Sequence, residues 1–417
     1  MDTTATIIFW AVLAIILLET LWGAVLDHLN VKASKLPIPD LLKDIYDADK
    51  YRRQQDYFAA NTRFGRISSA FDTALSVGMF AFGFFGWLSS VLGGWTGSMV
   101  LQTFLFIAIT SGLSEILGIP FSYYRTFVIE ERFGFNKTTR RTFAGDAVKG
   151  FLVDLVISGG LMAALCAIYR WIPDIFWIVG FAVMGLFSVV LSYFYSEIIV
   201  PLFNRQTPLE EGELRSAILS FADKAGFALK DIYVMDGSKR STKANAYFTG
   251  FGRKKRIVLY DTLIEKMTTE ETVAVLAHEI GHYRKGHIWK GMLSGMLQSL
   301  VMMYILGKVL PSDAIAQAAG ADGATFYINM LVFTMLWSPV SFVLGIFGNV
   351  SSRRHERQAD AFACSYGLGE PLASALKKLS ADSLSNLTPH PAVVYTSYSH
   401  PTLYQRVLAC TGKTESK

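Results

Sequence analysis

The sequence has little charge and few cysteines for its length. Charged residues make up 18% of 417 residues, against about 25% in ordinary soluble domains. The three cysteines, Cys166, Cys364 and Cys410, are too widely spaced for a disulfide framework or a CxxC metal site. The chain also lacks an internal repeat and a low-complexity tract. These absences argue against a plain cytosolic globule, a disulfide-rich domain and a disordered chain.

Long apolar blocks stand in place of the missing charge, and hydrophobic residues make up 52% of the chain. A membrane-spanning helix needs about 20 mostly apolar residues. Seven blocks meet this requirement: 7–26, 69–92, 98–122, 150–169, 174–200, 289–310 and 325–347. The first does not resemble a cleaved signal peptide, because no basic segment precedes it and no small-x-small site follows it. We therefore predict a mainly α, polytopic membrane protein with seven transmembrane helices.

Basic residues are concentrated in the odd-numbered loops between these blocks and in the tail. The first, third and fifth loops and the C-terminal tail together contain 36 of the 39 lysines and arginines. With seven spans, these segments share one side of the membrane. Because cytoplasmic loops are enriched in lysine and arginine, we expect loops 1, 3 and 5 and the C-terminus to be cytoplasmic.

Five acidic residues interrupt or end the apolar blocks. They are Glu19, Asp72, Glu115, Asp154 and Glu197. Each costs about 2.5–3.5 kcal/mol at the centre of a bilayer, so we expect these side chains to face the protein interior or a wet cavity. Packing between helices and lining a functional cavity are both open interpretations.

The sequence divides into two predicted domains. Residues 1–203 form a membrane domain with five spans, and residues 204–417 form a second domain that includes spans six and seven and the tail. The fifth loop predicts an amphipathic helix near 208–226, a strand at 231–235 and a hairpin with arms at 244–249 and 256–260. The second domain is therefore expected to contain a small α+β unit.

Residues 278–282 read His-Glu-Ile-Gly-His, the HExxH pattern. A helix places residues i and i+4 on one face, so His278 and His282 can bind one metal ion together. Glu279 lies about 100° further round the helix. It can take a proton from metal-bound water there but cannot readily join the histidines as a ligand. Thr268 and two following glutamates predict the start of this helix.

A catalytic zinc site has three protein ligands and one open position, so a third ligand is required. His287 lies about 140° beyond His282 on a continuous helix and is expected to be solvated or interfacial. The segment after the last span offers His355, Glu356 and Asp360. Glu356 and Asp360 lie on one helical face, so one can bind zinc while the other hydrogen-bonds a ligand histidine. Spacing favours Glu356 over His355 as the ligand.

These motifs together resemble the type I CAAX prenyl endopeptidases, a family of integral-membrane zinc proteases. The resemblance extends over nearly the whole chain and rests on seven spans and five separated segments: 245–248, 255–263, 278–282, 353–363 and 399–406. His355 is a departure, since asparagine is expected there in many relatives. The resemblance implies spans that enclose a water-filled chamber with one zinc ion per chain inside it.

The resemblance also implies roles for single residues. It makes His278, His282 and Glu356 the zinc ligands, Glu279 the general base and Asp360 a support for the ligands. His400 and Arg406 would stabilise the oxyanion formed on the scissile carbonyl. The strand that contains Asn245, Ala246, Tyr247 and Phe248 would hold an extended substrate by its backbone.

The implied reaction is cleavage of a C-terminal CAAX motif with a prenylated cysteine, removing the last three residues. A general membrane quality-control metalloprotease is the nearest alternative, and a transporter or non-catalytic scaffold is an alternative from another class. We expect a peptide or protein substrate, contact with the lipid bilayer, no nucleic acid and a monomer. A bacterial inner membrane is favoured, with the endoplasmic reticulum as the other option.

Overall fold

The structure is a computed structural model that describes residues 2–229, 231–249 and 256–413. The membrane helices are α1 (Thr3–Ala33), α2 (Ala48–Ala81), α3 (Phe84–Trp95), α4 (Met99–Tyr124) with the π-helical η2 (Arg125–Glu130), α5 (Arg140–Asp154), α6 (Gly160–Trp171), α7 (Phe176–Phe194), α11 (His287–Val309) and α13 (Phe326–Ser365), with α12 (Asp313–Ala318) between the last two. The remaining elements are β1 (Gln206–Pro208), α8 (Glu213–Lys224), β2 (Asp231–Met235), β3 (Ala246–Thr249), β4 (Arg256–Tyr260), α9 (Asp261–Lys266), α10 (Thr269–Arg284), α14 (Gly369–Asp382), α15 (Pro391–Ser397) and α16 (Leu403–Thr411).

The long helices are apolar but mostly unburied. Among the described residues, six helices are long and apolar enough to cross a membrane, and α2 with α3 can count as a seventh. In the six single helices, only 6–17% of the most apolar window is buried inside the protein. A large exposed apolar surface is unfavourable in water, whereas a bilayer solvates it. The chain is therefore a multi-pass membrane protein, as predicted.

The second span differs from the single helix predicted over 69–92. It is a pair of helices, α2 and α3, that meet at 58°. Gly83 lies between them with a φ of +68°, a conformation that glycine adopts readily. The helix α3 then packs against the end of α12, where a Cβ atom on Gly86 would lie 2.0 Å from the carbonyl oxygen of Gly320. The bend at Gly83 brings α3 into this close backbone contact, which spacing along the chain does not reveal.

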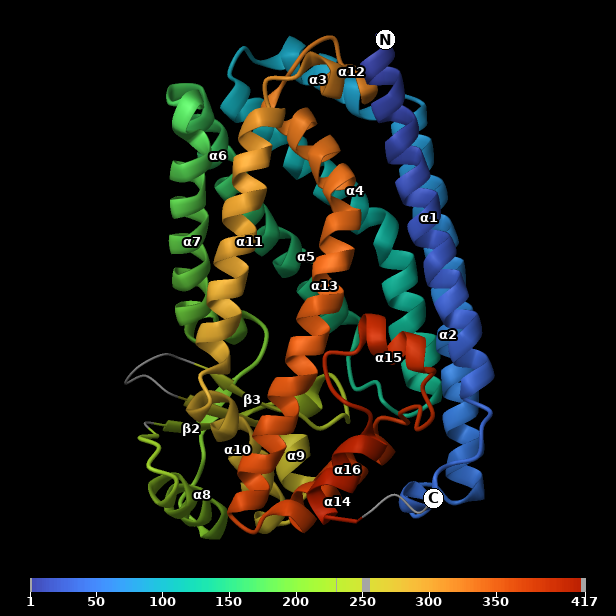
Figure 1. The fold of residues 1–417 in the computed structure, drawn as a ribbon, viewed down its shortest axis with the longest axis vertical. Coiled ribbons are helices and arrows are strands. Elements are labelled where there is room, and N and C mark those ends of the chain that lie inside the picture. Colours follow the sequence, from blue (N-terminus) through green and yellow to red (C-terminus); the bar gives the residue numbers. More distant parts are fainter. Residues whose placement is uncertain (1, 230, 250–255, 414–417) are drawn as a thin grey trace.

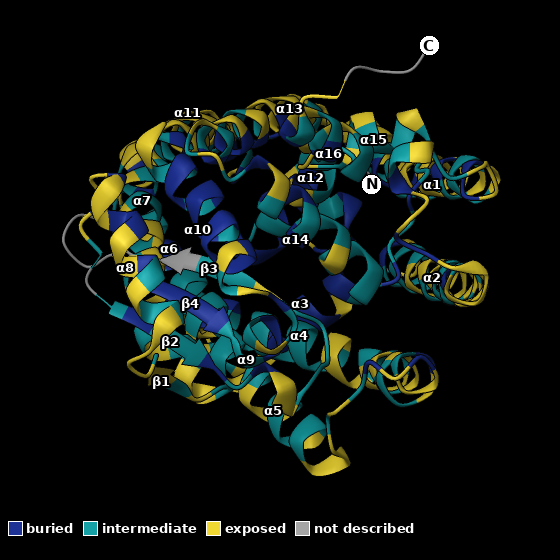
Figure 2. Ribbon diagram, turned by 90° about the horizontal axis from the view of Figure 1, so that it is seen from below, coloured by how far each residue is buried: buried dark blue, intermediate teal, exposed yellow. Residues whose placement is uncertain are grey.

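Figure 1 shows the N-terminus, α3 and α12 at one end of the molecule and α8, α10, α14 and α16 at the other. Successive spans therefore alternate in direction, and the basic loops and tail lie at the end that contains the HExxH helix α10. Seen from that end in Figure 2, α1, α2, α7, α11 and α13 stand around the periphery and α10 lies inside them. The segment that carries the metal motif thus lies at one end of the bundle, within the outline of the membrane helices in this projection.

The acidic residues of the spans lie at cavities or form ion pairs. Glu19 and Asp72 line a cavity of 690 Å³ bounded by α1, α2, η2 and α13. Glu115 and Asp154 line a cavity of 290 Å³ between α4 and α5. Glu197 forms an ion pair of 3.0 Å with the first residue of β4. Glu19, Asp72 and Glu115 are exposed at these cavities, and the expectation that such side chains face a wet cavity rather than lipid stays a prediction.

The fifth loop forms a four-stranded sheet with the order β1-β2-β4-β3. The strand predicted at 231–235 is β2, and the predicted hairpin arms are β3 and β4, which pair antiparallel. The turn predicted between them, with Gly250 and Gly252, lies outside the described residues. Within the described residues, β3 has a neighbour on one side only, so it is an edge strand. The HExxH helix α10 and the sheet share one buried core.

The start of α10 is held by a capping box. The Thr268 hydroxyl accepts a hydrogen bond from the Glu271 backbone N–H, and the Glu271 carboxylate accepts one from the Thr268 N–H. Glu271 also accepts from Lys378 and Ser374 of α14 at 2.6 Å each. Burial raises the pKa of Glu271, but these hydrogen bonds outweigh burial and lower it. The Glu271 carboxylate therefore links the HExxH helix α10 to α14.

We predict that Glu271→Ala lowers the free energy of unfolding by about 1–2 kcal/mol, because it removes a helix cap and a buried ion pair. The thermal unfolding midpoint of detergent-purified protein measures this loss. Glu270→Ala is the matched control, since Glu270 is exposed in the same helical turn. A lowered carboxyl pKa stabilises the fold above its usual titration range, so the difference from wild type should be full at pH 7 and shrink as the pH falls below about 4.5. Equal midpoints for the two variants would contradict this prediction.

Candidate metal centre

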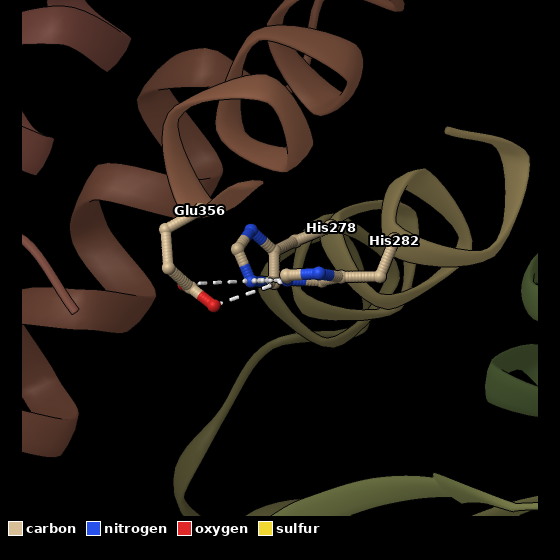
Figure 3. Close-up of side chains that lie close together, drawn as sticks. All are labelled: His278, His282 and Glu356. Carbon is tan, nitrogen blue, oxygen red and sulfur yellow. Dashed lines mark hydrogen bonds and ion pairs between the residues drawn. The ribbon is translucent and has the colours of Figure 1, made fainter. Parts of the chain in front are cut away.

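A close contact between α10 and α13 builds the centre. A Cβ atom on Gly281 would lie 3.1 Å from the Ala359 Cα atom and 3.1 Å from the Phe362 Cβ atom. The glycine of the HExxH motif therefore lets the two helix backbones approach. At this crossing, α10 presents His278 and His282 to Glu356 of α13 (Figure 3).

The three side chains converge on one point. The Glu356 carboxylate lies 3.3 Å from His278 Nε2 and 3.2 Å from His282 Nε2, and the two Nε2 atoms lie 3.2 Å apart. One donor atom from each of the three residues lies within 4.8 Å of the others. His278 and Glu356 are buried, whereas His282 is partly exposed. The group is thus enclosed on one side and accessible on the other.

The chemistry of these atoms fits a divalent cation. His278 donates from Nδ1 to Asp360 Oδ1 at 2.8 Å, so in the neutral form of the ring Nε2 carries a lone pair directed at the other two residues. The buried Glu356 Oε2 atom lies 3.3 Å from His278 Nε2, and it forms no well-aligned hydrogen bond among the described residues. Burial lowers the pKa of His278, but hydrogen bonds with Asp360 and Glu356 outweigh burial and raise it to about 9. A proton and a cation therefore compete for this electron-rich group.

Glu279 lies next to these residues on α10 and is half-buried. Within the described part of the chain, its carboxylate forms no hydrogen bond or ion pair that would hold it elsewhere. His355, the other candidate for the third ligand, is not in the converging group. Its ring instead stacks on His287, with centroids 4.1 Å apart.

Arg406 of α16 forms a bidentate ion pair with Asp360. Its guanidinium donates from Nε to Asp360 Oδ2 at 2.9 Å and from Nη2 to Oδ1 at 2.6 Å. The remaining Nη1 lies 3.6 Å from Glu356 Oε2, and the side chain is 11% exposed. Arg406 thus holds the carboxylate that orients His278, and its geometry fits a positioning residue better than a donor to substrate.

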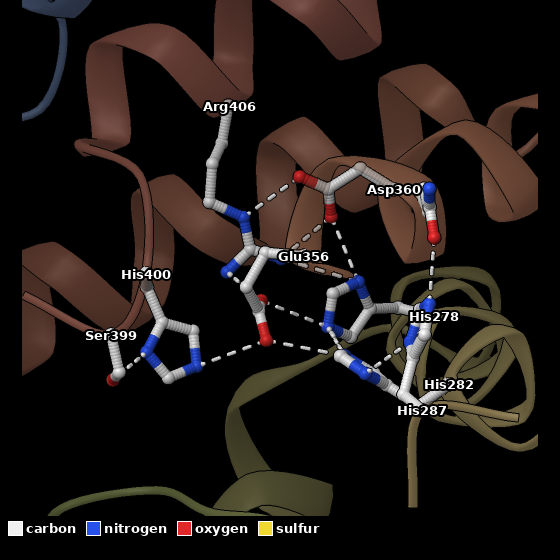
Figure 4. Close-up of polar contacts among 9 residues, drawn as sticks. His278, His282, His287, Glu356, Asp360, Ser399, His400 and Arg406 are labelled. Carbon is white, nitrogen blue, oxygen red and sulfur yellow. Dashed lines mark hydrogen bonds and ion pairs between the residues drawn. The ribbon is translucent and has the colours of Figure 1, made fainter. Parts of the chain in front are cut away.

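His400 lies on the open side of the group, on the loop before α16 (Figure 4). Its Nε2 atom is 3.4 Å from Glu356 Oε1, and its side chain is 59% exposed. Its Nδ1 atom is 2.8 Å from the Ser399 hydroxyl oxygen. A ring that borders the site and faces solvent can contact a molecule bound there.

The predicted substrate strand is the edge strand β3. The Asn245 carbonyl, just before β3, accepts from the Tyr260 N–H. Because bonded pairs alternate along an antiparallel ladder, Tyr247 also bonds towards β4, and the backbone groups of Ala246 and Phe248 face the open edge. A bidentate bond from Arg240 to Asp146 of α5, at 2.8 Å for both contacts, holds the segment before β3 against the membrane helices.

The expectation for His287 is wrong. His287 is 6% exposed, and its Nδ1 atom lies 3.0 Å from His282 Nδ1. The expectation assumed one continuous helix, but α10 ends at Arg284 and α11 begins at His287. Gly286 has a φ of +67°, which turns the chain so that His287 faces back towards α10. A glycine between the motif and the histidine was the signal for this turn. Gln358, which contacts His287 at 2.8 Å, was also missed.

Two family models match the chain in succession. The model described as the CAAX prenyl protease N-terminal region, with five membrane helices, matches residues 27–205. The model of peptidase family M48 matches residues 208–413. Together they extend over most of the chain, including all residues of the converging group.

Relatives match over nearly the full length. CAAX prenyl protease 1 of Saccharomyces cerevisiae is 33% identical, with 93% of this chain and 91% of the yeast protein covered. The CAAX prenyl protease 1 homolog of Homo sapiens is 31% identical, with 96% and 95% covered. The crystal structure of S. mikatae Ste24p superposes with a TM-score of 0.92 at 30% identity, over 97% of this chain and 99% of that one.

We predict that Arg406→Ala destabilises the protein by about 3 kcal/mol, because it leaves Asp360 without its ion-pair partner in a buried position. Arg406→Lys should give a smaller loss, since lysine keeps the charge but cannot form both parallel bonds. Thermal unfolding of the purified variants measures both effects. Arg357→Ala, which removes an exposed arginine of α13, is the control. If Arg406→Ala unfolds at the same temperature as this control, the Arg406–Asp360 pair has no structural role.

Proposed function

Because this chain belongs to the M48 peptidase family that contains the CAAX prenyl protease 1 enzymes, we propose that it cleaves C-terminal CAAX-type peptides with a prenylated cysteine. The family consists of integral-membrane zinc metalloproteases, and the chain is a metalloprotease of this kind. The observation that carries the proposal is the convergence of two imidazoles and one carboxylate at the end of a membrane bundle. The near-complete match to relatives named for this activity supports the substrate class.

We infer one zinc ion per chain, held by His278, His282 and Glu356. Two histidines and a glutamate are a ligand set of catalytic zinc sites, which keep a further position open. The partly exposed side of His282 is where that position would lie. Bound zinc acts as a Lewis acid and makes water a nucleophile near neutral pH.

The side chains of the protein would then divide the proton transfer and charge stabilisation. Glu279 would take the proton of the attacking water and deliver it to the leaving amine, a role that contributes about 10²–10⁴-fold. His400 would donate from Nε2 to the oxyanion that develops on the scissile carbonyl. Its exposed ring at the border of the site supports this role. Asp360 and Arg406 would hold His278 in place.

We propose that β3 binds the substrate as an added strand. Ala246 and Phe248 direct backbone groups to the open edge, and Ala246 packs against the core that also contains α10. Backbone pairing makes few demands on substrate side chains. This mode suits an enzyme whose substrates share a short, variable C-terminal sequence.

The basic end of the molecule supports a cytoplasmic position for loops 1, 3 and 5 and the C-terminus. The metal centre would then open on the side where prenylated C-termini are attached to membranes. We favour a monomer in a bacterial inner membrane, with the endoplasmic reticulum as the alternative. We also propose the division into a membrane domain at 1–203 and a peptidase domain at 204–417, which the boundary between the two family models supports.

We predict that Glu279→Gln retains one zinc per chain but loses at least about 10²-fold in cleavage rate, because it removes the general base and leaves the ligands. His282→Ala should lose both zinc and activity. Elemental analysis of purified protein and a peptide-cleavage assay measure the two properties. Glu270→Gln, an exposed glutamate of the same helix, should match wild type. Full activity in Glu279→Gln would rule out its role as the base.

The substrate class is tested with matched CAAX peptides that carry or lack a prenyl group. We expect zinc-dependent removal of the last three residues, abolished by a chelator and restored by zinc, with the prenylated peptide cleaved at the higher kcat/KM. Equal cleavage of both peptides and of unrelated extended peptides would instead favour a general membrane quality-control protease. Mass spectrometry of the products identifies the bond that is broken.

A further inference from the structure

A partly buried row of hydrogen bonds continues from the second ligand histidine away from the metal centre. His282 Nδ1 lies 3.0 Å from His287 Nδ1. The other nitrogen of His287, Nε2, lies 2.8 Å from the side-chain oxygen of Gln358. His282 comes from α10, His287 from the start of α11 and Gln358 from α13. Three helices therefore contribute side chains to one row of hydrogen bonds, of which His282 and His287 are labelled in Figure 4.

The two residues at the ends of this row of hydrogen bonds, Gln358 and His282, determine where its protons lie. The Gln358 carbonyl oxygen only accepts, so the proton of a neutral His287 lies on Nε2 and its Nδ1 is an acceptor. The Nδ1 atom of His282 must then donate, which leaves His282 Nε2 with the lone pair that faces Glu356 and His278. Metal binding requires the same arrangement, because a ligand nitrogen must be unprotonated. With His282 Nε2 as the ligand, the proton of the neutral His282 ring lies on Nδ1.

The environment of His287 keeps this arrangement rigid. The side chain is almost fully buried, and the His355 ring lies on it at an interplanar angle of 13°. The two ligand histidines thus receive different support. His278 donates to a carboxylate, Asp360, whereas His282 donates to a neutral ring that a neutral amide orients.

We propose that His287 is a positioning residue for the metal centre, which fixes the tautomer and the ring orientation in which His282 offers Nε2 to zinc. This inference rests on the proposed zinc site. Gln358 acts through His287, because its hydrogen bond to His287 Nε2 keeps the acceptor atom Nδ1 of His287 directed at His282. Partners of this kind typically contribute about 10–100-fold to metal affinity.

The test measures the zinc dissociation constant of the metal-free, full-length protein in detergent by competition with a chelator of known affinity. His287→Phe keeps a flat ring beside His355 but has no acceptor, and we expect affinity to fall by about 10–100-fold. His287→Asn places an acceptor oxygen near the position of Nδ1 and should recover most of the loss. Gln358→Leu should give a smaller loss than His287→Phe, because it frees the His287 tautomer without removing the ring.

His355→Phe is the matched control, because it keeps a flat ring in the same stack and His355 is not one of the three converging residues. Its zinc affinity should equal that of wild type, and the unfolding temperature of each metal-free variant shows that it remains folded under the conditions of the zinc titration. The proposal is overturned if His287→Phe binds zinc like wild type, if His355→Phe loses as much affinity, or if His287→Asn recovers none. A wild-type protein that binds no zinc would instead overturn the proposed metal.

Discussion

The close approach of α10 and α13 is the contact on which the metal centre depends. It exists because the HExxH motif contains Gly281, whose missing side chain leaves room for the backbone of α13 at Ala359. Helices that cross at such a distance bring ligands together that lie more than seventy residues apart in the chain. The capping box at Thr268 and the bonds from Glu271 to α14 then prevent α10 from shifting along that contact. Catalytic geometry is thus a property of helix packing rather than of the motif alone.

Around this contact, charge is arranged so that each polar group supports the next. Arg406 neutralises Asp360, and Asp360 orients His278. On the other side, Gln358 and His287 support His282. Buried polar groups are costly unless they have partners, and here the partners come from α10, α11, α13 and α16. The same bonds that make burial of these groups possible also hold the ligands in one orientation.

For the rest of the chain, the membrane makes an apolar outer surface stable. Helices such as α1 expose tryptophan and leucine side chains. Their exposure would be unfavourable in water, whereas lipid solvates them. Burial is concentrated at the two ends, in the core beneath the metal centre and in the cluster around α3 and α12. Acidic side chains in between line cavities. A bundle held mainly at its ends can surround polar space in which an extended peptide reaches the site.

The sequence by itself determined the mainly helical class, the apolar blocks, the alternation of basic loops, the strands β2 to β4 and the HExxH helix with its cap. These are local patterns, set by periodicity, composition and capping chemistry within a few residues. Spacing and the family resemblance already favoured Glu356 over His355, and the structure shows that Glu356 is the one that converges with the histidines. Only the tertiary structure shows that Arg406 pairs with Asp360. It also bent the second span at Gly83 and turned His287 back at Gly286. Each of these outcomes depends on where a helix ends and which helix crosses it, and neither is contained in spacing along one chain.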